Sequence, residues 1–137
     1  RKSPCFLCSW NRRKALFETA QQLSCGKVVL GHHRDDFLET LLMNMFFQGS
    51  IQAMPPALQM DKMPLKVIRP LCLIDESDLQ EFAAQNNYPE QVKICPFEKE
   101  SNRPDVRALL EELEARFPGV KDSLWASMQH IYPQYLP

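Results

Sequence analysis

Glycine is scarce in this sequence, because its 137 residues contain only Gly26, Gly31, Gly49 and Gly119. These four do not form a glycine-rich loop, the element that cradles phosphate groups with a row of backbone N–H groups. If this chain takes part in binding a nucleotide, we therefore expect the loop that grips the phosphates to lie outside these residues.

Long apolar runs and an excess of charge are also missing. No apolar run approaches the roughly 20 residues that a membrane span needs, and no signal peptide is visible. The 16 basic side chains nearly balance the 17 acidic ones, for a net charge of −1. This balance excludes a global attraction to nucleic acid, so any RNA binding must come from local patches. We expect a cytoplasmic protein with no membrane partner.

Cysteine is present in an odd number, five, which argues against a complete disulfide framework. Cys5 and Cys8 form a Cys-x-x-Cys pair. In a reducing cytosol such a pair more often binds metal or does redox work than forms a structural disulfide. From the pair alone, a zinc site, an iron–sulfur site and an idle reduced pair all remain open. Cys25 and Cys72 have apolar neighbours, and we expect them to be buried.

Apolar periodicity predicts five helices and two strands. The predicted helices cover residues 11–24, 32–47, 75–87, 104–117 and a last segment through Leu124, Trp125 and Met128, and the predicted strands cover residues 27–31 and 65–71. Residues 48–64 are expected to be a loop, since three prolines interrupt them. Gly26 is expected to stop the first helix, and Asp75 or Ser77 to cap the third.

The expected buried faces follow from the same spacing. They comprise Leu16, Phe17, Ala20 and Leu23 in the first helix, Phe37, Leu38, Leu41, Leu42, Met45 and Phe46 in the second, and Val106, Leu109, Leu110 and Leu113 in the fourth. The order helix, strand, helix indicates an α/β fold with a doubly wound parallel sheet. Two strands are too few for such a sheet and the first residue is Arg1, so we expect N-terminal strands to be missing from this chain.

The turn at residues 30–40 follows a strand and opens a helix, which is where open α/β sheets place their ligands. A helix N-terminus attracts anions, yet Asp35 and Asp36 would repel a bare phosphate. A magnesium ion between carboxylates and phosphates would reverse that sign, and His32 could donate a hydrogen bond. The structural alternative is a capping box formed by Asp36 and Glu39.

Basic side chains gather near the cysteine pair. Arg12 and Arg13 follow Cys8 by four and five residues in the predicted first helix, and Arg103 precedes the fourth. They are candidates for contacts with RNA phosphates, and the alternative is a solvated helix face. Arg69, at the end of a strand, is a candidate for a nucleotide or RNA phosphate.

Together these segments resemble one family. The sequences PCFLCSWNRRKAL, LGHHRDDFLETLLMN, MPP, VIRPL and SMQHIYP occur in the order found in the PP-loop ATPases that thiolate tRNA. The nearest subgroup makes 2-thiocytidine in tRNA. The resemblance implies an adenine-nucleotide alpha-hydrolase-like fold, of which residues 1–137 would be the helix-rich C-terminal part of a single domain. The N-terminal strands and the pyrophosphate loop would be absent, so we expect the chain alone to lack ATPase activity.

The resemblance also implies a reaction and its ligands. ATP would adenylate the C2 oxygen of a cytidine, and a sulfur nucleophile would then displace AMP. ATP and magnesium would be held by Gly31, His32, Asp35, Asp36 and Arg69. A 4Fe-4S cluster, with zinc as the alternative metal, would be held by Cys5, Cys8 and Cys95. RNA would contact Arg12, Arg13 and Arg103. No catalytic side chain is assigned.

The implied partners are tRNA, a sulfur donor system and a second copy of the protein in a homodimer. Two rival functions remain. One is another PP-loop adenylating ligase, of the lysidine-forming or amide-forming type, which does not need three thiols. The other is a zinc-stapled RNA-binding module with no enzymatic activity.

Overall fold

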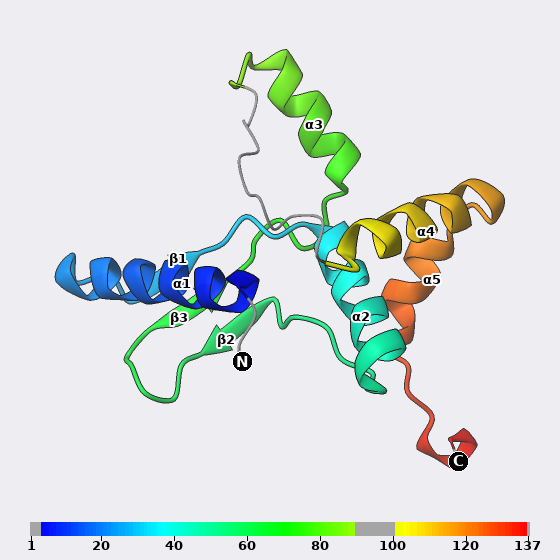
Figure 1. Cartoon of the computed structure of the whole chain (residues 1–137), viewed down its shortest axis with the longest axis horizontal. Coiled ribbons are helices and arrows are strands. Elements are labelled where there is room, and N and C mark those ends of the chain that lie inside the picture. The colour runs from blue at the N-terminus through cyan, green and yellow to red at the C-terminus, as the bar shows by residue number, and fades with distance from the viewer. Residues whose placement is uncertain (1–3, 90–100, 137) are drawn as a thin grey trace. The chain divides into compact units, whose positions relative to one another are not determined.

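The computed structural model describes residues 4–89 and 101–136, and these fall into two compact units (Figure 1). The sheet unit comprises Arg1–Arg34 and Pro55–Glu100, and the helical unit comprises Asp35–Met54 and Ser101–Pro137. Each unit has a hydrophobic core of its own. Within the described residues, every helix is too short or too polar to cross a membrane.

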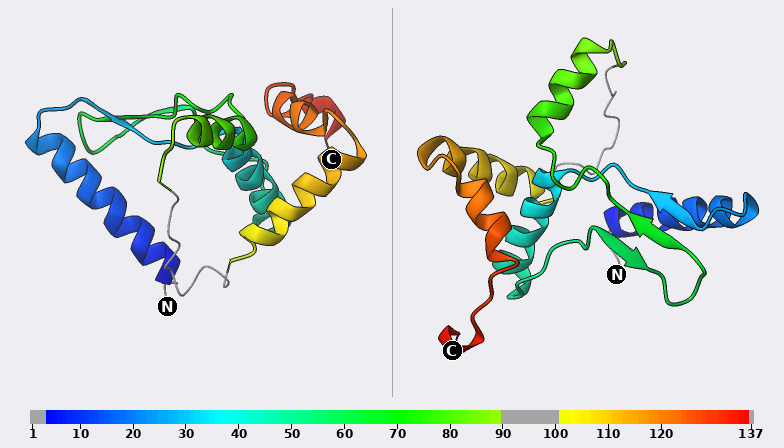
Figure 2. Two further views of the ribbon diagram at one scale, coloured as in Figure 1. Left: turned by 90° about the horizontal axis from the view of Figure 1, so that it is seen from above. Right: turned by 180° about the vertical axis from the view of Figure 1, so that it is seen from behind.

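The sheet has three short strands, β1 (Lys27–Val29), β2 (Ala57–Gln59) and β3 (Lys66–Ile68), in the order β1-β3-β2. β1 runs parallel to β3, with Val28 opposite Val67. The α/β class and the parallel pair are therefore confirmed. Figure 2 shows the neighbouring strands from behind, with the chain turning from β2 into β3.

β2 corrects the prediction that residues 48–64 are a loop. It pairs antiparallel with β3, and Met60 N donates to Leu65 O at 2.9 Å across the hairpin. Pro56 and Pro64 lie outside both strands. They therefore flank the hairpin without removing a hydrogen bond from its strands, which is the placement that proline tolerates in a sheet.

Helix α1 (Pro4–Gln22) packs on the sheet through Ala20, which is buried with Val28 and Leu65. It begins earlier than predicted, because proline is well suited to a first helical turn. Two residues of its expected buried face are exposed, Leu16 at 40% and Leu23 at 69%.

The stop signal of α1 also differs from the prediction. The helix ends at Gln22, and Ser24 adopts the left-handed conformation with φ 54°. Cys25 N donates to Ala20 O at 2.8 Å and so satisfies one of the last helical carbonyls. The left-handed residue comes two positions before Gly26, so the prediction that Gly26 terminates the helix was wrong.

Helix α3 (Glu76–Gln85) begins after Asp75, whose side chain pairs with Arg34 of the sheet unit. The Arg34 guanidinium binds both carboxylate oxygens of Asp75, with Nη2 2.8 Å from Oδ2 and Nε on Oδ1. Asp75 occupies the N-cap position, as predicted, but its side chain makes no capping hydrogen bond. The fork-shaped pair with Arg34 is a stronger alternative use of that carboxylate.

The helical unit contains α2 (Arg34–Gln48), α4 (Arg103–Arg116), α5 (Val120–Ser127) and the short 3₁₀ helix η2 (Pro133–Tyr135). The first residue of α2, Arg34, is assigned to the sheet unit. Its core is a cluster of Leu38, Leu42, Val106 and Leu110, against which Trp125 packs. Gly119 has φ 90°, which a residue with a side chain rarely adopts, and so permits the tight turn between α4 and α5.

Three residues of the predicted buried faces are more exposed than expected. Met45 and Phe46 near the end of α2 are 41% and 51% exposed, and Leu109 in α4 is 38% exposed. Its neighbour Leu110 is 2% exposed. Helical spacing predicted that both leucines are buried, and only Leu110 lies in the core.

This difference predicts unequal effects of two adjacent substitutions. Leu110→Ala should lower the free energy of unfolding by about 2–5 kcal/mol, because it leaves a cavity in the helical core. Leu109→Ala, the matched control, should cost less than about 1 kcal/mol. Equilibrium unfolding in urea measures both values, and equal losses would contradict the assigned core.

Candidate functional site

The cysteine pair lies on the first turns of α1. Cys5 and Cys8 are both exposed thiols, and residues three apart lie on the same face of a helix. Soft thiolates in this arrangement suit iron or zinc. Two of the three predicted cluster ligands are therefore brought together.

The third predicted ligand, Cys95, lies outside the described residues. Among residues 4–89 and 101–136, there is no group of three His, Cys, Asp or Glu side chains that could hold a metal. The cluster thus stays a prediction. The remaining cysteines differ from expectation, because Cys25 is exposed and Cys72 is only half-buried.

The α1 helix carries its basic residues just after the cysteine pair. Arg13 Nε donates to Ser9 O at 3.3 Å, and Ser9 Oγ donates to Phe6 O at 3.0 Å. Lys14 lies 5.6 Å from the centre of the Trp10 ring and 3.7 Å from Glu18. Contacts within the helix therefore orient the side chains that follow Cys8.

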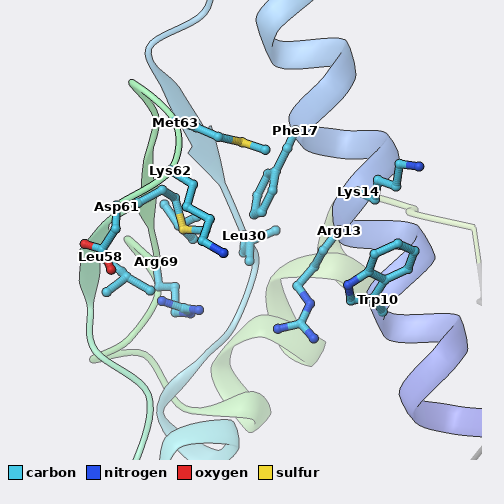
Figure 3. A pocket seen from close by; sticks show the side chains of 12 residues that line it. Trp10, Arg13, Lys14, Phe17, Leu30, Leu58, Asp61, Lys62, Met63 and Arg69 are labelled. Atoms are coloured by element: carbon cyan, nitrogen blue, oxygen red, sulfur yellow. The ribbon is translucent and has the colours of Figure 1, made fainter. Parts of the chain in front are cut away.

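A cavity of about 500 Å³ opens beside α1 within the sheet unit (Figure 3). We call it the α1 cavity; its lining residues are Trp10, Arg13, Lys14, Phe17, Leu30, Leu58, Met60, Asp61, Lys62, Met63, Val67 and Arg69. The lining combines four cationic side chains and one carboxylate with apolar and aromatic side chains. Sequence reasoning found Arg13 and Arg69 separately and did not predict that they share a cavity.

Arg69 is held at the end of β3 by two hydrogen bonds. Its Nη1 donates to Pro55 O at 2.6 Å, and its Nε donates to His32 Nδ1 at 3.1 Å. Burial, and then the positive charge of Arg13, lower the pKa of Arg69 from its usual value. The structure thus brings together His32 and Arg69, two of the predicted nucleotide-binding residues.

The bond from Arg69 also defines the tautomer of His32. Because Nδ1 accepts a hydrogen bond, the proton of the neutral ring belongs on Nε2. His32 can therefore donate from Nε2, as the sequence predicts for contact with a phosphate or base. Gly31, immediately before it, has nothing within 4 Å of the place where a Cβ would lie.

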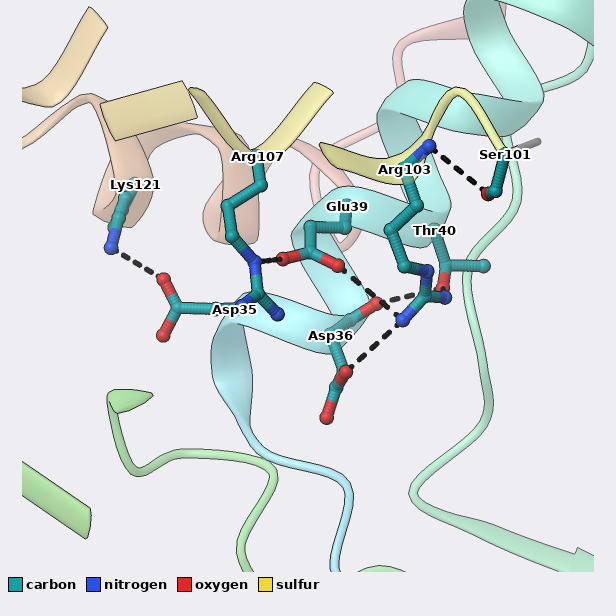
Figure 4. Close-up of polar contacts among 8 residues, drawn as sticks. All are labelled: Asp35, Asp36, Glu39, Thr40, Ser101, Arg103, Arg107 and Lys121. Atoms are coloured by element: carbon teal, nitrogen blue, oxygen red, sulfur yellow. Dashed lines mark hydrogen bonds and ion pairs between the residues drawn. The ribbon is translucent and has the colours of Figure 1, made fainter. Parts of the chain in front are cut away.

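In the helical unit, three carboxylates at the start of α2 face three cations from α4 and α5 (Figure 4). Lys121 binds Asp35, which is 6% exposed. Arg103 Nη1 lies 3.2 Å from Asp36 Oδ1. The predicted magnesium ligands Asp35 and Asp36 are therefore both engaged in ion pairs.

Glu39 is the most deeply buried of these carboxylates, at 0% exposure. Its Oε1 accepts a hydrogen bond from Arg107 Nε at 2.7 Å. Its Oε2 lies 3.3 Å from Arg103 Nη1 but makes no hydrogen bond, so that contact is one of charge alone.

The capping-box interpretation of Asp36 and Glu39 was wrong, since α2 begins at Arg34 and Asp36 lies inside the helix. Sequence reasoning also missed Arg107 and Lys121 as ionic partners. A signal for the first was available: Arg103 and Arg107 are four residues apart and so lie on one face of α4, and both pair with Glu39.

A sequence profile of the PP-loop domain matches residues 10–109 of this chain. The tRNA-cytidine(32) 2-sulfurtransferase of Verminephrobacter eiseniae is 42% identical over 136 residues, which are 98% of this chain and 43% of that protein. Its namesake from Aeromonas hydrophila is 40% identical, over 98% of this chain and 45% of that protein. The chain spans less than half the length of these relatives.

Among solved structures, the U34-tRNA thiolase NcsA from Methanococcus maripaludis, with its 4Fe-4S cluster, is similar to this chain. The TM-score is 0.75 and the sequence identity 26%, and the match covers 96% of this chain and 46% of that one. The fold predicted from the sequence is thereby confirmed.

The buried position of Glu39 predicts a specific cost of removing its partner. Arg107→Met should lower the free energy of unfolding by about 1–3 kcal/mol, because a buried carboxylate loses its charge-assisted hydrogen bond. Lys14→Met removes a cation from an exposed pair and should cost less than about 1 kcal/mol. Urea unfolding measures both variants, and equal costs would show that burial of Glu39 does not matter.

Proposed function

Since this chain belongs to the PP-loop domain family, we propose that the full-length protein transfers sulfur to a cytidine of tRNA in an ATP-dependent reaction. The names of its relatives suggest cytidine 32 as the target. The observation that carries the proposal is the exposed pair of Cys5 and Cys8 on one face of α1. This pair occurs in a chain about 40% identical to tRNA sulfurtransferases over 98% of its length.

The proposed chemistry has two steps. A pyrimidine carbonyl oxygen is a poor leaving group. Transfer of AMP from ATP to the C2 oxygen of cytidine releases pyrophosphate. The oxygen then becomes part of a good leaving group, AMP. A sulfur nucleophile then attacks C2, the C2–O bond breaks, and AMP departs with the oxygen.

The ATP-binding residues remain those predicted from the sequence. In the sheet unit, Gly31, His32 and Arg69 follow the ends of the two parallel strands, where α/β folds bind nucleotides. In the helical unit, Asp35 and Asp36 are the proposed magnesium ligands. Lys121 and Arg103 form ion pairs with these carboxylates, so magnesium would have to compete with the two cations.

The thiols fit an iron–sulfur cluster in their chemistry, and we propose Cys5, Cys8 and Cys95 as its ligands. Three protein ligands leave one iron available, so a bound cluster would supply sulfide for the reaction. Arg12 and Arg13 follow the pair on α1 and are proposed to bind tRNA phosphates. Arg103 is a weaker candidate for that role, because it already pairs with Asp36 and Glu39.

The remaining partners are proposals as well. A sulfur donor system must regenerate the sulfur that each turnover consumes. A homodimer and a cytoplasmic location complete the proposal, in keeping with a tRNA substrate and with cysteines that need reducing conditions.

The experiment is a comparison of two cysteine variants of the full-length protein, purified without oxygen. Cys5→Ser should lose most bound iron and labile sulfide and should abolish formation of the thiolated nucleoside, because a hydroxyl is a poor ligand for iron. Cys25→Ser, an exposed cysteine outside the proposed ligand set, should keep both. Metal analysis and mass spectrometry of digested tRNA provide the two readouts.

The same measurements separate the rival functions. An adenylating ligase would retain its activity in the Cys5→Ser variant. A zinc-stapled RNA-binding module would contain one zinc and no labile sulfide in the wild type, and would modify no tRNA.

A further inference from the structure

The α1 cavity concentrates positive charge in a chain whose net charge is −1. Its lining includes Arg13, Lys14, Lys62 and Arg69 but a single carboxylate, that of Asp61. At about 500 Å³ it is within the range of small-molecule sites, roughly 300–1,000 Å³. Charge complementarity therefore favours an anionic occupant.

Two guanidinium groups approach the cavity from opposite walls. Arg13 extends from α1 and Arg69 from the end of β3, and they point toward one another in Figure 3. Their charges repel, which is one reason that the pKa of Arg69 is lowered. A phosphate between them would replace this repulsion with two charge-assisted contacts, for which guanidinium is well shaped.

The cavity also offers an aromatic surface beside the two arginines. Phe17 packs against the core of the sheet unit, whereas Trp10 is 49% exposed. Exposed tryptophan beside cationic side chains is typical of sites that stack a base of single-stranded nucleic acid.

We propose that the α1 cavity binds one nucleotide of the tRNA, with its phosphate between Arg13 and Arg69 and its base against Trp10. This inference rests on the proposed function, and it names where in the chain the RNA is held. Arg13 follows Cys8 by five residues, a rise of about 8 Å along a helix. The bound nucleotide would thus lie close to the cysteine pair.

ATP presents the same chemical groups, a base and phosphates, but it suits the cavity less well. A triphosphate is usually held by several backbone N–H groups or by a metal ion. Glycine is absent from the described lining, as are Asp35 and Asp36, and of the predicted ATP ligands only Arg69 is included. Two guanidiniums and one indole match a single phosphodiester and its base.

The test measures tRNA and ATP affinity of the full-length protein and three variants. Arg13→Gln should raise the Kd for tRNA about tenfold, through loss of a charge-assisted contact. It should also reduce the slope of log K against log salt by about 0.7, the value for one phosphate of a single strand. Trp10→Ala should raise the Kd roughly tenfold and leave the slope unchanged.

Arg116→Gln is the matched control, since it removes an exposed arginine in the helical unit, outside the cavity. It should leave both the Kd and the slope unchanged. All three variants should bind ATP like the wild type, and circular dichroism should show equal helix content. A photoreactive residue at Trp10 should crosslink to one stretch of the tRNA.

The outcomes distinguish this inference from the proposed function. The inference is overturned if Arg13→Gln and Trp10→Ala bind tRNA as the wild type does, or if they weaken ATP binding and not tRNA binding. A wild type that does not bind tRNA overturns both. Loss of tRNA affinity in these variants, together with a wild type that fails to thiolate, would support the RNA site and contradict the sulfurtransferase.

Discussion

The parallel pairing of β1 with β3 is the constraint on which the sheet unit depends. Val29 lies opposite Ile68, and Leu30 N donates to Ile68 O at 3.0 Å, which extends the ladder by one bond beyond the strand. Both strands end at the same edge, so His32 and Arg69 meet although 37 residues separate them. A slip of one residue in this register would place Arg69 on the opposite face, away from His32 and the α1 cavity.

The helical unit is organised by buried charge as well as by apolar packing. Glu39 follows Leu38, a member of the helical core, and takes its partners from α4. Buried ion pairs add little net stability compared with apolar residues of the same size, but removal of one partner is costly. The pairing therefore acts mainly on how α4 docks, because Arg103 and Arg107 supply the cations that Glu39 needs.

The order and type of the helices could be predicted from apolar spacing together with cap and proline signals. The second predicted helix is an example: Phe37, Leu38, Leu41 and Leu42 are all buried where the spacing places them. β2 could not be found this way, because three residues between prolines show no alternation. Its formation depends on β3, the strand with which it pairs.

Site residues were predictable as chemical types and less so as contacts. Cys5, Cys8, His32 and Arg69 stand out by spacing or by position after a strand. The partners of Asp35 and Glu39 come from residues more than 60 positions away, and local patterns do not report such distances. The opposed guanidiniums of Arg13 and Arg69 likewise arise from packing of α1 on the sheet.

Because Cys5 and Cys8 lie on a regular helix, the geometry of that helix affects how the pair oxidises in air. Side chains three residues apart on a helix have Cβ atoms roughly 5–6 Å apart, whereas an oxidised cysteine pair prefers about 3.5–4.5 Å. Aerial oxidation would therefore draw the two Cβ atoms together and distort the opening turn of α1. A strained bond would be easily reduced, so mild thiol treatment should restore the two thiols of the pair.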